Sequence, residues 1–155
     1  MGEVLKKWLK MNKEIPEREA VDLNIRVAAA LLEGKFNSFS EKFNITMSQY
    51  NVLRILKGVY PEGHARCEIA SRMIERSPDI TRLIDRLEKQ GLVERDRIDK
   101  DRRISITKIT EKGIKLVDKM HLMVEEGHKE TTKNLTETEC KELSELLEKY
   151  YEKMT

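Results

Sequence analysis

One stretch of the sequence, residues 77–109, places strong limits on the fold because it joins a short amphipathic helix to a charged hairpin. Ser77, Pro78 and Asp79 predict the start of the helix. Serine is a favoured N-cap, proline fits the first helical position, and aspartate faces the positive end of the helix dipole. Gly91 predicts the end of the helix, because glycine readily adopts the left-handed conformation that closes a helix.

The predicted helix has one apolar and one polar side. Its apolar residues follow the i, i+3, i+4, i+7 rule and predict a face buried in a core: Ile80, Leu83, Ile84 and Leu87. The opposite side is mostly charged and is flanked by Thr81 and Arg86: Pro78, Arg82, Asp85 and Lys89. The helix therefore has a polar face that is free to meet a partner.

Two short segments with alternating apolar residues follow the helix, residues 92–95 and 104–107. This alternation predicts two strands. The segment between them, residues 97–103, is too charged to lie in a core. A helix followed by a strand, a basic tip and a second strand is the pattern of a winged helix.

Helix signals also precede this stretch. Residues 4–9 predict a short amphipathic helix, which packing against the protein or a second subunit explains better than a membrane surface does. A long helix is expected to begin near Pro16, with apolar residues over more of its surface than one partner covers. Residues 46–49 form a capping box that opens another helix. The next helix, around residues 69–73, has no obvious N-cap and is expected to be the first helix of a helix-turn-helix.

Two helices are predicted after the hairpin. Thr110 caps the first, whose apolar stripe includes His121 and His128 as core or interface residues. Residues 136–139 form a second capping box, and Cys140 begins the apolar stripe that follows and is expected to be core. Both helices have long apolar faces and acidic backs.

Composition limits the class of protein. The chain of 155 residues is long enough for one domain with a real core, and 37% charged with 5% aromatic residues suits a well-solvated helical protein. Residues 66–113 hold 13 Lys and Arg against 10 Asp and Glu, whereas residues 114–155 hold 7 against 10. Two cysteines do not make a disulfide framework, and no membrane-spanning run or signal peptide is visible, so a cytoplasmic protein is expected.

Taken in order, these features resemble the MarR family of bacterial transcriptional regulators. The resemblance is carried by residues 77–95, by Asp101-Arg102-Arg103 at the hairpin tip and by residues 109–113, and it extends upstream through residues 68–70. It implies a mainly α fold with a small β wing, a winged helix-turn-helix at about residues 46–113. Helices from about residues 1–45 and 114–155 form the dimerisation part.

The resemblance also implies a function. A protein of this kind is a homodimer that binds a pseudo-palindromic operator in double-stranded DNA and represses transcription. It releases the DNA when a small-molecule effector enters the crevice between the dimerisation helices and the DNA-binding part. No cofactor and no enzymatic activity are expected, because the sequence shows no Gly-rich phosphate loop, nucleophile elbow or carboxylate pair in a plausible cleft.

The polar face of the helix is then expected to face DNA. An arginine can donate two hydrogen bonds to guanine, which discriminates between bases by ~1–3 kcal/mol, and short hydroxyl side chains suit phosphates or base edges. The residues expected at DNA are Ser77, Pro78, Thr81, Arg82 and Arg86. On any other solvated helix the same residues are simply exposed, so the prediction depends on the adjoining wing.

The wing supplies a second set of candidates. By the resemblance, Arg103 enters the minor groove while Asp101 holds its guanidinium in position; a narrow A·T-rich groove concentrates negative potential. The alternative is a surface ion pair on a loop. The other basic residues are expected to contact phosphates, which positions the protein without specifying sequence: Arg95, Arg97, Lys100 and Arg102.

The sequence leaves three alternatives to a ligand-responsive DNA-binding protein. A redox-gated regulator is suggested by Cys67 near a predicted helix start, where a thiolate is stabilised. A metal-gated regulator is less favoured, and no metal site is predicted, because His121 and His128 are two turns apart rather than at the i, i+4 spacing of a chelating pair. A winged helix that binds only proteins needs no basic wing, so Arg102 and Arg103 favour DNA.

Overall fold

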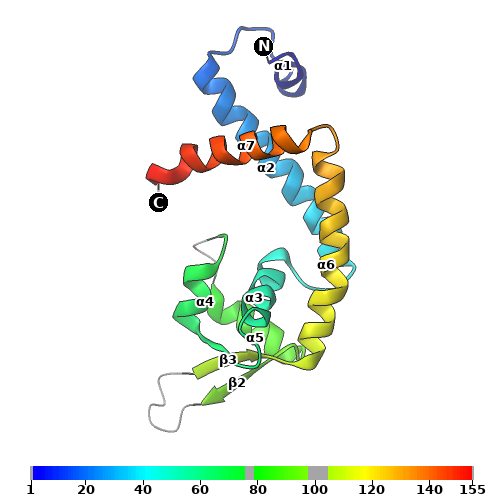
Figure 1. The fold of residues 1–155 in the computed structure, drawn as a ribbon, viewed down its shortest axis with the longest axis vertical. Coiled ribbons are helices and arrows are strands. Elements are labelled where there is room, and N and C mark those ends of the chain that lie inside the picture. The colour runs from blue at the N-terminus through cyan, green and yellow to red at the C-terminus, as the bar shows by residue number, and fades with distance from the viewer. Residues whose placement is uncertain (1, 76–78, 98–104, 155) are drawn as a thin grey trace.

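The computed structural model describes residues 2–75, 79–97 and 105–154, apart from the side chains of residues 39, 40 and 97. The described chain is mainly helical with one small sheet (Figure 1). Its elements in order are α1 (Glu3–Leu9), α2 (Glu17–Glu41), α3 (Met47–Lys57), β1 (His64–Ala65), α4 (Arg66–Arg72), α5 (Ile80–Lys89), β2 (Val93–Arg97), β3 (Ser105–Ile109), α6 (Glu111–Thr132), α7 (Glu137–Tyr151) and the 3-10 helix η1 (Glu152–Met154).

The helix starts follow the capping signals of the sequence. Thr46 and Gln49 form the predicted capping box at the start of α3, in which each side chain accepts a hydrogen bond from the other's backbone N–H. Thr110 caps α6 through the N–H of Gly113, and Thr136 opens α7 with a second capping box. Helix α4 has no side-chain cap, as predicted. These local predictions are confirmed.

Helices α3, α4 and α5 pack with the sheet and the first half of α6 around one core (Figure 1). Its fully buried apolar side chains include Val52, Leu53, Leu56, Ile69, Ile84, Leu87, Val93 and Met120. Burial of such side chains contributes ~1.5–3 kcal/mol each. This core holds α5 rigidly between α3, α4 and β2.

Both ends of α5 are fixed by hydrogen bonds. Its N-cap is Asp79, whose carboxylate accepts from the N–H of Arg82, so the prediction of Ser77 as N-cap was wrong. Asp is as good a cap as Ser, and Asp79 also pairs with a side chain of the first turn. At the other end Gly91 has φ 68°, and the N–H groups of Gly91 and Leu92 donate to the carbonyls of Glu88 and Leu87. This is a Schellman motif, and the predicted glycine stop is confirmed.

The sheet has the strand order β1-β3-β2, and both pairs are antiparallel. Strands β2 and β3 form the predicted hairpin, in which Val93 pairs with Ile109 and Arg95 with Thr107. The sequence missed β1, because two residues are too few to show an alternation. With the sheet beside the helix-turn-helix, the fold is a winged helix-turn-helix.

The remaining helices extend away from the hairpin. In Figure 1, α1, the first half of α2 and α7 lie at the opposite end of the molecule from β2 and β3. Helix α7 has no buried residue and touches α2 through a hydrogen bond from Tyr150 to Asp22, at 2.6 Å. Large apolar side chains are exposed on these helices: Val4, Trp8, Val21, Leu31, Leu32, Leu143, Leu146 and Tyr151.

Three side chains differ from the predicted apolar stripes of α6 and α7. His121 is exposed and lies 3.4 Å from a carboxylate oxygen of Glu125. His128 is also exposed, with its ring edge-on to that of Phe36. Cys140 is half-buried rather than core, and the described part of the chain leaves no residue of α7 buried. A core position is therefore wrong for these three residues in the single chain, and the interface alternative for the two histidines stays a prediction.

Candidate nucleic-acid interface

Helix α5 has a buried apolar side and an exposed polar side, as its sequence pattern predicted. Ile80, Ile84 and Leu87 are buried, and Leu83 is partly buried against the same core. The exposed polar side chains of α5 include Thr81, Arg82, Arg86 and Lys89. Since the apolar face is fixed in the core, the polar face is presented on a rigid support.

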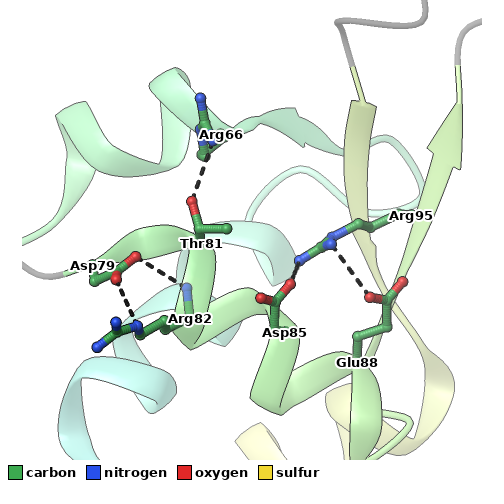
Figure 2. A network of polar contacts seen from close by, with 7 residues as sticks. All are labelled: Arg66, Asp79, Thr81, Arg82, Asp85, Glu88 and Arg95. Carbon is green, nitrogen blue, oxygen red and sulfur yellow. Dashed lines mark hydrogen bonds and ion pairs between the residues drawn. The ribbon is translucent and has the colours of Figure 1, made fainter.

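Arg82 is held at the helix start by Asp79. One oxygen of the Asp79 carboxylate accepts from the backbone N–H of Arg82 at 3.2 Å, and the other lies 3.1 Å from Nε of the same residue (Figure 2). The Arg82 side chain is nevertheless 78% exposed. The guanidinium is therefore oriented by the helix cap and remains accessible to a partner.

Thr81 has a neighbour that the sequence did not suggest. Nη1 of Arg66, the first residue of α4, donates a hydrogen bond of 3.2 Å to the hydroxyl of Thr81 (Figure 2). Arg66 is exposed. It precedes the predicted apolar positions of its helix and carries no motif, so only the packing of α4 beside α5 reveals it.

Arg95 on β2 has a different environment from Arg82. Its Nη2 donates to the carboxylate of Asp85 on α5, and its Nη1 lies 3.5 Å from Oε2 of Glu88 (Figure 2). Its side chain is only 29% exposed. The guanidinium thus bridges the hairpin and the helix.

Part of the predicted set lies in segments that the structure does not describe. Ser77 and Pro78 at the helix start and four residues of the wing tip lie outside the described residues: Lys100, Asp101, Arg102 and Arg103. Arg97 is the last residue of β2, and its side chain also lies outside them. Of the predicted contacts, Arg82 lies on the exposed polar side of α5, and Thr81 and Arg86 flank it.

A crevice of about 430 Å³ lies between α2, α3, α6 and the residues after α4. About half of its lining residues are apolar, among them Leu32 and Phe36, and the others are polar or charged, among them Arg54 and His128; Tyr50 also lines it. The Tyr50 hydroxyl is buried and has no hydrogen-bond partner among the described residues. Burial raises the pKa of Tyr50, and the nearby charges of Arg54 and Lys57 oppose this only in part.

Comparison with known proteins places this arrangement in a family. A model of the MarR family matches residues 45–105. A solved MarR transcription factor from Planctomyces limnophilus is 34% identical, and the match covers 88% of this chain and 98% of that one with a TM-score of 0.69. The chain belongs to the MarR family of transcriptional regulators.

This MarR-family protein is also similar to two other known proteins. The HTH-type transcriptional repressor IacR of Pseudomonas putida is 28% identical over 109 residues, which are 70% of this chain but only 64% of the repressor's length. A solved complex of S. aureus MepR with DNA is 24% identical, covers 90% of this chain and 99% of that one, and has a TM-score of 0.78. At that identity the likeness shows the fold alone.

Three further features of the MarR-family protein concern a metal site, a free thiol and membrane-spanning helices. The described residues contain no group of three or more His, Cys, Asp or Glu side chains placed to hold a metal. Cys67, the second residue of α4, is an exposed free thiol. None of the helices in the described part of the chain combines the length and apolarity that crossing a bilayer requires.

Proposed function

We propose that this protein is a cytoplasmic repressor that binds a pseudo-palindromic operator in double-stranded DNA as a homodimer. The exposed polar face of α5 carries the proposal, because Thr81, Arg82 and Arg86 stand on a helix fixed at both ends beside the hairpin. In this arrangement α5 is the recognition helix and the β2–β3 hairpin is the wing. The Pseudomonas putida relative is named as a repressor, which supports repression rather than activation of transcription.

The proposed contacts divide into two classes. Thr81, Arg82 and Arg86, with Ser77 and Pro78 before them, enter the major groove, where side chains distinguish base pairs. Arg66 joins them as a phosphate contact, because it lies beside Thr81 and is exposed. The wing residues Arg97, Lys100, Asp101, Arg102 and Arg103 complete the interface, with Arg103 in the minor groove.

The homodimer is proposed from apolar surface that the chain does not cover itself. No described side chain of α2 is buried, and α7 has no buried residue. Contiguous apolar surfaces of this kind mark association sites. A second copy of the chain, with its α1, α2 and α7 packed against the first, buries them and places two recognition helices for two half-sites.

We also propose that a small-molecule effector binds in the crevice beside Tyr50. The crevice combines apolar side chains with several polar groups, which suits a ligand that has both apolar and polar parts. It touches both α2, from the dimerisation part, and the residues after α4 that lead to the recognition helix. A ligand there changes their relative position, and so the spacing of the recognition helices.

The test is selection from a pool of random-sequence DNA duplexes by the purified protein. We expect enrichment of two similar inverted half-sites about 10 bp apart, one helical turn of DNA. Affinity for the selected duplex should fall steeply with salt, with a log–log slope of about 0.9 per neutralised phosphate. No enrichment, or enrichment of single half-sites by a monomer, contradicts the proposal.

A further inference from the structure

The contacts of Arg95 set it apart from the other basic residues near the interface. Both terminal nitrogens of its guanidinium are directed at α5, Nη2 at Asp85 and Nη1 at Glu88 (Figure 2). Arg82, by contrast, pairs through Nε and keeps most of its side chain in solvent. A phosphate contact requires terminal nitrogens that are free to reach outward, so the geometry of Arg95 does not suit one.

The two carboxylates are arranged to receive a guanidinium. Asp85 and Glu88 are three residues apart on α5 and therefore project from the same side of the helix. The planar fork of arginine can bond to both at once, whereas the ammonium of lysine is a single point charge. Two carboxylates against one guanidinium leave net negative charge close to a DNA-facing surface. That charge opposes DNA binding, so we expect the carboxylates to serve another purpose.

The hairpin needs such a connection. Its apolar attachment to the core lies at its base, where Val93 and Ile109 pair and are both buried. Two residues further along β2, Arg95 connects the hairpin to the middle of α5 through Asp85 and Glu88. The next residue, Asp96, forms an ion pair of 2.6 Å with Lys108 of β3. This pair holds the two strands to each other rather than to the helix.

We infer that Arg95 is a positioning residue that fixes the angle of the wing against the recognition helix through Asp85 and Glu88. This replaces the phosphate contact expected from the sequence, and it rests on the proposed DNA-binding function. The carboxylates of Asp85 and Glu88 thus favour specific binding indirectly, although their charge opposes the approach of DNA.

The first test asks whether Asp85→Asn raises or lowers the affinity of the protein for DNA. Removing a negative charge near DNA strengthens binding or leaves it unchanged if only electrostatics matters. If Asp85 positions Arg95, affinity for the duplex that the parent protein selects should instead fall about tenfold, or about 1.4 kcal/mol. Glu94→Gln is the matched control, because Glu94 is an exposed carboxylate on the adjacent position of β2 and is not a partner of Arg95. It should bind at least as tightly as the parent.

The second test separates a bridging guanidinium from a phosphate contact. Arg95→Lys keeps the charge, so it should bind nearly as well as the parent if Arg95 contacts phosphate. If Arg95 bridges two carboxylates, Lys should lose about as much affinity as Asp85→Asn, and the double variant should lose little more than either alone. Affinities are measured well below the unfolding transition, where a residue that contributes only to stability leaves binding by the folded protein unchanged.

The third test needs no DNA and therefore distinguishes failure of the inference from failure of the proposed function. Hydrogen exchange of the β2–β3 amides should become roughly tenfold faster in Arg95→Lys and Asp85→Asn, and stay unchanged in Glu94→Gln. Stronger binding by Asp85→Asn, or unchanged exchange in the hairpin, overturns the role of Arg95. A parent protein that selects no duplex overturns the DNA-binding function while the exchange comparison still decides the role of Arg95.

Discussion

The carboxylate of Asp79 contacts Arg82 twice, through the backbone N–H at 3.2 Å and through Nε of the guanidinium at 3.1 Å. One side chain therefore both caps α5 and orients the exposed guanidinium of Arg82. The two roles can be separated, because an amide oxygen still caps a helix but attracts a guanidinium less than a carboxylate does.

Asp79→Ala should lower the free energy of unfolding by about 1 kcal/mol, the usual cost of a lost N-cap, whereas Asp79→Asn should leave it nearly unchanged. Both variants should weaken discrimination between the selected duplex and a mixed-sequence duplex, since neither keeps the ion pair to Arg82. Denaturant unfolding and DNA titration measure the two effects. Equal stability losses in both variants contradict the cap, and unchanged discrimination contradicts the orienting role.

Arg82→Ala should leave the fold intact, because exposed substitutions usually change stability by less than ~0.5 kcal/mol. Affinity for the selected duplex should fall by ~1–3 kcal/mol with little change on a mixed-sequence duplex, if the side chain reads a base edge. Titrations at several salt concentrations decide this. Equal losses on both duplexes, with a salt slope smaller by about one, make Arg82 a phosphate contact instead. If Arg82→Ala binds both duplexes as tightly as the parent, the face of α5 that carries Arg82 does not lie in the groove.

Leu146→Glu should weaken the homodimer about 10- to 100-fold, because an apolar side chain of α7 that is 64% exposed in one chain is expected to be buried by the second. Sedimentation measures the dissociation constant. Lys141→Gln is the control, since it makes the same change in net charge on the opposite side of the helix. A parent protein that is monomeric at micromolar concentration removes the two-half-site arrangement altogether.

Tyr50→Phe should raise the free energy of unfolding by ~1 kcal/mol, since it removes a buried hydroxyl without a partner among the described residues. The raised pKa of Tyr50 means that the folded protein holds the phenol proton more tightly than the unfolded chain. Stability of the parent should therefore fall as pH rises above the ordinary value of 10.0, and its deficit relative to Tyr50→Phe should widen. Unfolding at neutral and alkaline pH, with exposed Tyr60→Phe as control, tests both points. If Tyr50→Phe instead lowers the free energy of unfolding at neutral pH, the Tyr50 hydroxyl has a hydrogen-bond partner in the folded protein and the prediction is wrong.

Gly113→Ala should destabilise the protein by ~1–3 kcal/mol, because a Cβ at this position of α6 would lie 2.3 Å from the carbonyl oxygen of Leu92. Gly58→Ala is the matched control: its Cβ meets nothing nearer than 3.5 Å, and its φ of −63° suits alanine. It should be neutral or stabilising by up to ~1 kcal/mol. Similar effects of both substitutions in thermal unfolding would show that the start of α6 shifts freely on the hairpin.

The sequence by itself determined the elements whose signals lie within one or two turns. Thr46, Thr110 and Thr136 cap the helices that their neighbours predicted, and Gly91 closes α5. The apolar spacing of α5 also predicted which face is buried. These features could be predicted because capping and helical periodicity depend on residues that are already adjacent in the chain.

Only the tertiary structure decided which groups meet across elements. Ser77 and Asp79 are both residue types that cap helices well. In the folded protein α5 begins after Asp79, which is its N-cap. Arg66 is brought to Thr81 by the docking of α4 on α5, and Arg95 is brought to Asp85 and Glu88 by the docking of the hairpin. A basic residue in a sequence carries the same charge whether it faces solvent or a carboxylate. Its partner is set by the long-range packing of apolar faces, which the local pattern of the chain does not contain.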